Sequence, residues 1–202
     1  NVSFSCSASW LERTDTVAKA DDYLCQGKGL KLLLPPKNSN GSVEVYGKSG
    51  GCHWTLPEEG LKLQYFIFWD DLTVDISLRR GEVLNRSCED TGSSPLILFT
   101  DVDWWNPYIN QAQTLMAYVS VAALDLDPRT LRLILMQGKR RGDGPKTVDG
   151  PMKSLHTLLF SQGGPSIELE NEAQLICTDN LIIPTGGRRN LFRSLGQMPT
   201  DV

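Results

Sequence analysis

The sequence has little of what marks a membrane protein, a nucleic-acid-binding protein or a familiar enzyme. No run of about 18 apolar residues occurs, so this segment is predicted to hold no membrane span. The net charge of −4 supplies no strong positive field for nucleic acid. A P-loop, a GxGxxG motif and an HExxH motif are all absent. The two histidines, His53 and His156, form no ligand or catalytic pattern, and we interpret both as structural.

Cysteine is spread thinly along the chain, and no CxxC pair indicates a zinc site. Glycosylation sequons begin at Asn1, Asn40 and Asn85. Sequons and scattered cysteines together favour the secretory lumen or the cell exterior, and a cytosolic protein with free thiols is the alternative. Spacing does not decide which cysteines pair, and the odd count leaves one unpaired or paired outside this segment. The disulfide candidates are Cys6, Cys25, Cys52, Cys88 and Cys177.

The length allows one large domain or two small ones, and the composition is that of a globular protein: 202 residues, 40% hydrophobic and 22% charged. Because the sequence shows no initial Met and no signal peptide, we expect a segment of a longer protein. A polar linker over residues 81–94 predicts a soft boundary. It separates a β-rich part, residues 1–90, from an α/β part, residues 91–202.

The stretch from residue 96 to residue 136 predicts a strand, a helix and a second strand. Residues 96–99 and 131–136 are the two apolar runs. Asn106-Pro107 is a typical helix start, and Asp127-Pro128 ends the helix. The two strands of such a βαβ unit are expected to be parallel neighbours in a sheet covered by helices. Apolar residues recur at helical spacing at Tyr108, Ala112, Leu115, Met116, Val119 and Ala122.

Shorter patterns predict the other elements. Residues 61–67 and 72–78 alternate in polarity on either side of a turn predicted at Asp70-Asp71, which indicates a β-hairpin. Residues 25–29 are predicted to form a turn, and residues 151–160 a short helix. Further strands are expected at residues 30–34, 43–46, 173–177 and 181–183.

A cluster of polar and aromatic residues follows the first strand of the βαβ unit, where an open α/β sheet places its ligand crevice. Indole faces stack on sugar rings while carboxylates and amides bond to hydroxyls, so the cluster suits a carbohydrate. The alternative is a helix N-cap with both tryptophans buried as core residues. Its Asp-x-Asp pattern is too common to indicate a metal, and no metal site is assigned. The cluster comprises Asp101, Asp103, Trp104, Trp105, Asn106, Tyr108 and Asn110.

The order of several motifs resembles glycosyltransferase family 61, especially the branch of the plant core β-1,2-xylosyltransferase and related secretory-pathway enzymes. Residues 23–30 (YLCQGKGL) are similar to the family's Cys-Glu/Gln-Gly-x-x-Leu segment. Cys88-Glu89 and residues 95–100 are similar to its Cys-Glu and Pro-Thr block, and residues 105–108 (WNPY) to its Asn-x-Tyr/Phe-His helix start.

Two later segments continue this resemblance. Residues 155–161 (LHTLLFS) are similar to the family's Trp-x-x-Leu-Phe-Ser helix, and Cys177 with residues 181–184 to the strand before its Pro-x-Gly turn. Two positions depart from the family pattern. Ile109 stands where the family has His, and Gln113 where it has an acidic residue.

The resemblance implies an enzyme of the Golgi or endoplasmic reticulum lumen with two GT-B-like lobes. It would transfer a sugar from a nucleotide-sugar donor to a glycan or glycoprotein acceptor. The chain would hold one Rossmann-like lobe with a parallel sheet core, preceded by a smaller antiparallel β region. A Gly-rich donor-binding lobe would follow it, so the segment alone is expected to be inactive. No cofactor is assigned beyond the donor, and metal dependence stays open.

For an inverting transfer, we expect Asp103 to deprotonate the acceptor hydroxyl, with Asp101 as the second candidate. The aromatic residues of the cluster would stack acceptor sugars. Basic residues 139–141 and 188–189 would face the diphosphate, or else lie in solvated loops. A non-catalytic carbohydrate-binding domain and a protein-interaction domain are the alternatives to an enzyme.

Overall fold

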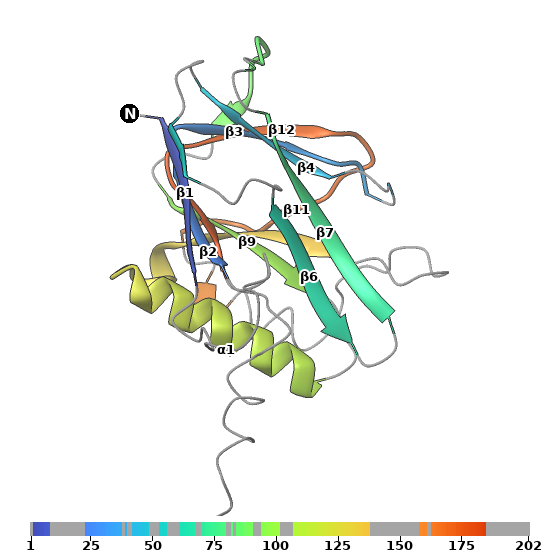
Figure 1. Cartoon of the computed structure of the whole chain (residues 1–202), viewed down its shortest axis with the longest axis vertical. Coiled ribbons are helices and arrows are strands. Elements are labelled where there is room, and N and C mark those ends of the chain that lie inside the picture. The colour runs from blue at the N-terminus through green and yellow to red at the C-terminus, as the bar shows by residue number, and fades with distance from the viewer. Residues whose placement is uncertain are drawn as a thin grey trace, which may run out of the picture.

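The described residues form a mixed α/β structure of two β-sheets with helix α1 (Pro107–Ala123) packed along one of them (Figure 1). A short 3-10 helix, η2 (Pro128–Thr130), follows α1, and residues 158–160 are helical. The structure is a computed structural model that describes residues 2–8, 23–37, 39, 42–48, 53–55, 61–67, 70–79, 82, 84–90, 94–101, 107–137, 158–160 and 163–184.

The first sheet has seven strands and combines parallel with antiparallel pairing. Its first four strands are parallel to one another, and the next two continue it in antiparallel fashion. The last strand pairs parallel with its neighbour. In order across the sheet, the strands are β11 (Ile167–Glu168), β10 (Arg132–Gln137), β9 (Leu96–Asp101), β13 (Leu181–Ile183), β2 (Tyr23–Lys28), β1 (Ser3–Ala8) and β5 (His53–Thr55).

The second sheet has six strands and is mainly antiparallel, with two parallel pairs. One of its strands, β12, comes from the C-terminal part of the chain and lies beside β3 from the N-terminal part. Across the sheet, the order is β6 (Leu61–Ile67), β7 (Asp70–Leu78), β4 (Val43–Gly47), β3 (Leu30–Leu34), β12 (Gln174–Thr178) and β8 (Glu89–Asp90).

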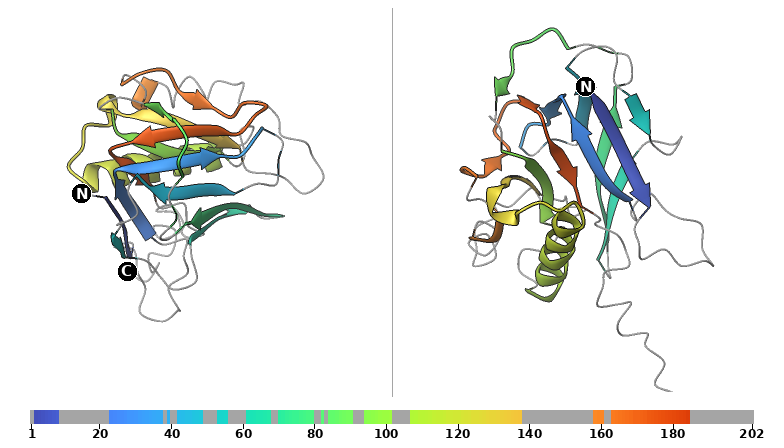
Figure 2. Two further views of the ribbon diagram at one scale, coloured as in Figure 1. Left: turned by 90° about the horizontal axis from the view of Figure 1, so that it is seen from above. Right: turned by 90° about the vertical axis from the view of Figure 1, so that its left-hand side faces the viewer.

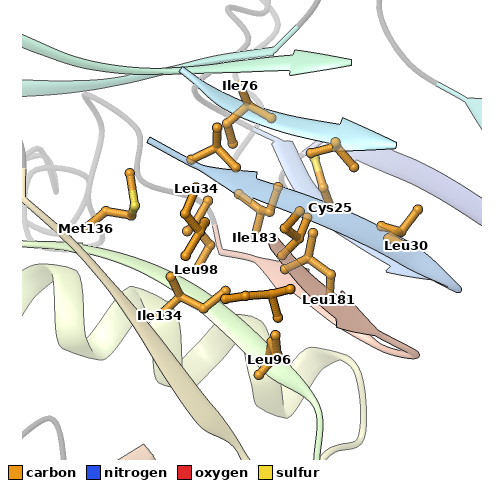
Figure 3. Packing of buried hydrophobic residues seen from close by; sticks show 14 of the residues in the cluster. Cys25, Leu30, Leu34, Ile76, Leu96, Leu98, Ile134, Met136, Leu181 and Ile183 are labelled. Carbon is orange, nitrogen blue, oxygen red and sulfur yellow. The ribbon is translucent and has the colours of Figure 1, made fainter. Parts of the chain in front are cut away.

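The first sheet is the middle layer, because successive residues of its strands point into two different cores. In β9, Leu96 and Leu98 belong to the core shared with the second sheet, whereas Ile97 and Phe99 belong to the core under α1. The strands β10 and β13 alternate in the same way. Figure 2 gives two further views of these layers, and Figure 3 shows the side chains between the two sheets.

Burial on both faces explains why the parallel strands are continuous apolar runs rather than alternating ones. Leu96, Ile97, Leu98 and Phe99 are all buried, as are the residues at 133–136. Fully burying a side chain of this size contributes about 1.5–3 kcal/mol relative to leaving it exposed. The predicted parallel βαβ unit is confirmed, with β9 and β10 paired from Leu96↔Arg132 to Asp101↔Gln137.

The face of α1 that packs on the sheet differs from the predicted one. The buried residues in the described part of the helix are Thr114, Ala117, Ser120 and Val121. Ala122, predicted to be on the apolar face, is exposed. The buried stripe is carried by small or medium-sized side chains. At 3.6 residues per turn, the predicted set of larger apolar residues lies on roughly the opposite side of α1 from these buried residues.

Several strand predictions are confirmed, and others are wrong at their ends. Strands at 30–34, 43–47, 174–178 and 181–183 occur where they were expected, and β6 and β7 form the predicted hairpin. The turn predicted at Asp70-Asp71 is wrong, because both residues already belong to β7. The predicted turn at 25–29 is also wrong, since β2 continues to Lys28 and only Gly29, at φ 63°, bends the chain between β2 and β3.

The strands on either side of residue 90, where the boundary was predicted, share both sheets. Strands β1, β2 and β5 from the N-terminal side share the first sheet with β9, β10, β11 and β13. In the second sheet, β12 pairs antiparallel with β3 and parallel with β8. Both parts of the chain are thus joined by backbone hydrogen bonds.

Four of the five candidate cysteines form disulfides, as Cys6–Cys25 and Cys88–Cys177. Cys52 lies outside the described residues. The first bond joins directly opposed residues of β1 and β2, and the second ties the segment before β8 to β12. Disulfides are typical of secreted and lumenal proteins. In the described part of the chain, no helix has the length and apolarity that a bilayer span needs.

Candidate functional site

The order of the parallel strands reverses between β9 and β13. Numbered along the chain, the four parallel strands lie in the order 3-2-1-4, with β9 as strand 1 and β13 as strand 4. This is the order in half of a doubly wound sheet, where ligands bind beyond the carboxyl ends of the strands at the reversal. The candidate site is therefore the carboxyl edge of β9 and β13.

The connections on the two sides of this reversal run on opposite faces of the sheet. From β9 the chain passes through α1, which covers one face, to reach β10. From β11 it passes through β12, in the sheet on the other face, to reach β13. A strand of the second sheet thus occupies the place of the helix that a doubly wound sheet has there.

Strand β13 stops short of both its neighbours at this edge. It pairs with β9 at Leu96↔Leu181 and ends at Ile183, whereas β9 continues to Asp101. Pro184 follows, and proline has no N–H to extend a ladder. On the other side, β2 extends past the Cys25↔Ile183 pair to Tyr23. At the strand reversal, β13 therefore ends before the two strands on either side of it, β9 and β2.

The predicted cluster begins and ends at this edge. Asp101 is the last residue of β9 and pairs with Gln137, the last residue of β10. Tyr108 and Asn110 lie at the start of α1, which begins at Pro107. The residues between, which include Asp103, Trp104, Trp105 and Asn106, lie outside the described residues. The structure therefore fixes where the cluster is anchored.

The start of α1 adds a polar feature to the same edge. The first N–H groups of a helix lack partners within it, and they give its N-terminus a partial positive charge that favours anions. No acidic residue occupies the first turn of α1 to offset that charge. The basic residues 139–141 follow β10 closely, and residues 188–189 follow β13. Both basic segments lie outside the described residues.

The opposite edge of the parallel strands is tied together by backbone hydrogen bonds. The Leu96 amide donates to the Asn180 carbonyl at 2.8 Å, and the Arg132 amide to the Pro95 carbonyl at 2.9 Å. The Ser94 hydroxyl donates to the Gly163 carbonyl at 2.9 Å. A Cβ at Gly163 would overlap the Thr130 carbonyl, so the chain passes there without room for a side chain. We interpret this edge as structural.

A separate polar cluster lies in the second sheet. The Arg79 guanidinium and the Tyr46 hydroxyl both donate to the Glu44 carboxylate, the latter at 2.5 Å. The Arg79 hydrogen bond first, and the Tyr46 bond second, hold the pKa of Glu44 below its ordinary value. Burial, followed by the bond to Glu44, raises the pKa of Tyr46. Glu44 is a weak base at neutral pH, so the cluster suits an ion pair better than proton transfer.

Metal ligation finds no support in the described ranges, where no three His, Cys, Asp or Glu side chains are grouped to hold an ion. Sequence reasoning missed that the Tyr23 end of β2 lies at this edge, whereas the strand predicted at residues 181–183 ended before Pro184, as β13 does. Pro184 was visible as a break after an apolar run, whereas the strand order that brings β2 and β13 together had no local signal.

Comparison with known family models, curated proteins and solved structures finds no match for this chain.

Proposed function

We propose that the chain is part of a glycosyltransferase of the secretory pathway that transfers a sugar from a nucleotide-sugar donor to a glycan or glycoprotein acceptor. The observation that carries the proposal is the anchoring of the acidic and aromatic cluster at the strand reversal, where open α/β sheets bind ligands. The ordered motifs similar to glycosyltransferase family 61 support the same activity. The two disulfides support the Golgi or endoplasmic reticulum lumen as its location.

The proposed fold is one Rossmann-like lobe of a GT-B enzyme. The 3-2-1-4 order of the parallel strands and the α1 crossover support it. The second sheet would then replace the helices of one face. A second lobe with a Gly-rich donor-binding segment would complete the crevice, so this segment alone would be inactive.

The proposed mechanism is a single inverting displacement. Asp103, or failing that Asp101, takes the proton of the acceptor hydroxyl, whose oxygen bonds to the anomeric carbon as the bond to the diphosphate breaks. The diphosphate leaves with the electron pair and is stabilised by the N-terminus of α1 and by basic residues 139–141 or 188–189. Trp104, Trp105 and Tyr108 stack acceptor sugars, while Asn106 and Asn110 bond to their hydroxyls.

The test compares aspartate variants of the complete protein. With nucleotide sugars and glycan acceptors, Asp103→Asn should lower turnover by about 10²-fold or more while leaving the unfolding temperature unchanged, since general-base catalysis contributes at least that much. Asp101→Asn measures the second candidate. Asp125→Asn is the matched control, because Asp125 is exposed at φ 55°, a conformation that Asn tolerates. Full turnover in both cluster variants would remove the aspartates from the mechanism.

A non-catalytic carbohydrate-binding domain is the second candidate function, favoured by Ile109 and Gln113 at positions where the family has His and an acidic residue. Binding of free oligosaccharide without any turnover of nucleotide sugars would support it. Absence of both activities would favour a protein-interaction domain, with the aromatic cluster as its contact surface.

A further inference from the structure

One of the three sequons lies in a described and exposed segment of the chain. Asn85, Arg86 and Ser87 are consecutive exposed residues that precede Cys88. The Cys88–Cys177 disulfide and the short strand β8 hold the following residues against β12. Asn1 and Asn40 lie outside the described residues, so Asn85 is the sequon whose placement is known.

The backbone around Asn85 forms a tight turn. The Arg86 amide donates to the Leu84 carbonyl at 2.9 Å, which closes a three-residue turn with Asn85 at its centre. The ammonium of Lys31, from β3, donates to the carbonyls of Leu84 at 2.8 Å and of Arg86 at 3.2 Å. The carbonyls of both residues that flank Asn85 are thereby bound to Lys31 of the second sheet, while the asparagine itself stays exposed.

This turn lies far from the candidate site. In Figure 1 the segment before β8 is at the top of the molecule and α1 at the bottom, and the second view of Figure 2 separates them in the same way. β8 is an outer strand of the second sheet, whereas the candidate site lies at the carboxyl ends of β9 and β13 in the first sheet. A bulky group on Asn85 would extend into solvent without covering the candidate site.

We propose that Asn85 carries an N-linked glycan on the edge of the second sheet. The glycan is transferred in the lumen from a lipid diphosphate-linked oligosaccharide. The Asn85 amide nitrogen bonds to the anomeric carbon as the carbon–oxygen bond to the diphosphate breaks. The lipid diphosphate leaves with the electron pair, and the amide proton passes to a base of the host transferase. The folded chain then accommodates the glycan, since it occupies solvent beside an exposed turn.

The proposal is independent of the proposed enzymatic activity and is tested on the complete protein secreted from a eukaryotic host. Peptide mass spectrometry should find the peptide with Asn85 glycosylated, and a peptide N-glycosidase should convert Asn85 to aspartate. Asn85→Gln and Ser87→Ala should each remove one glycan from the electrophoretic pattern. Arg86→Ala and Ser87→Thr keep the sequon and should retain the glycan.

Two results would overturn the proposal. One is an unmodified Asn85 peptide in the secreted wild-type protein, a measurement that needs no variant to fold. The other is an unchanged electrophoretic pattern in Asn85→Gln. The failure of the proposed function is read separately, from sugar transfer, which Asn85→Gln should leave unchanged.

Discussion

At the scale of single residues, the Glu44 carboxylate links stability to pH. Its pKa is held below the ordinary value of 4.5 by the bonds from Arg79 and Tyr46. The contribution of such a group is fully present above its unfolded-state pKa and is lost as pH falls through the folded-state pKa. Acidification below about pH 4.5 should therefore weaken the attachment of Arg79, just beyond β7, to β4.

Substitution at Glu44 tests this linkage. Glu44→Gln should reduce the fall in unfolding free energy between neutral and acidic pH, and Tyr46→Phe should reduce it less, since Arg79 makes the larger contribution. Denaturant unfolding at a series of pH values measures both. Glu172→Gln, at an exposed position, is the control. If Glu44→Gln showed the same pH dependence of unfolding free energy as the wild-type protein, that dependence would arise from other groups.

Gly27 is required by packing rather than by backbone conformation. A Cβ there would overlap Leu30 Cδ1 and lie 2.7 Å from Phe4 Cδ2, and both side chains are fully buried. Gly27→Ala should lower the unfolding free energy by about 1–3 kcal/mol, the usual cost of overpacking. Urea titration measures it, and Lys28→Ala, at the exposed neighbouring position, should change little. Equal stability of the two variants would show that the strands move apart at low cost.

At the scale of elements, α1 meets the first sheet through small residues. Ala117→Leu should destabilise the protein by about 1–3 kcal/mol, because Ala117 is buried against the sheet. Ala122→Leu, the same change at an exposed position of the same helix, should be nearly neutral. Thermal unfolding of the two variants distinguishes the observed buried face of the helix from the predicted one. If the predicted face were buried, Ala122→Leu would be the more destabilising change.

Elements were predictable where the pattern was long or both faces were buried. The apolar runs of β9 and β10, together with a proline at each end of the helical stretch between them, were sufficient to predict the βαβ unit. Strand β1 was missed although Phe4, Cys6 and Ala8 alternate with serines, because short side chains make such an alternation faint. Its place in the sheet depends on pairing with β2, and no local sequence pattern encodes that pairing.

For the candidate site, the sequence predicted that Asp101 lies between a strand and a helix, but it did not predict which other strands lie beside that strand. Asp101 was placed at a strand's carboxyl end because a helix start follows it closely. Tyr23 and Pro184 come from distant segments of the sequence, and only the strand order places them at the same end of the sheet as Asp101.

At the scale of the whole molecule, the two disulfides constrain the chain unequally. Cys88–Cys177 joins residues 89 positions apart, whereas Cys6–Cys25 joins residues 19 apart. Chain entropy predicts that losing the first costs about 4–5 kcal/mol and losing the second about 3 kcal/mol. Denaturant unfolding of the paired serine variants, Cys88→Ser with Cys177→Ser and Cys6→Ser with Cys25→Ser, should show that order. The reverse order would mean that native contacts outweigh loop length.

The segment that carries β12 and β13 is the last described part of the chain to be synthesised, yet each of the two strands lies inside a sheet. β13 separates β9 from β2, and β12 separates β8 from β3. On the ribosome, each sheet must therefore wait as two unjoined halves with open edges until residues 174–183 emerge. Such edges invite pairing with other chains. A nascent chain of this protein depends on these two final strands, and on any chaperone that shields those edges until both strands emerge.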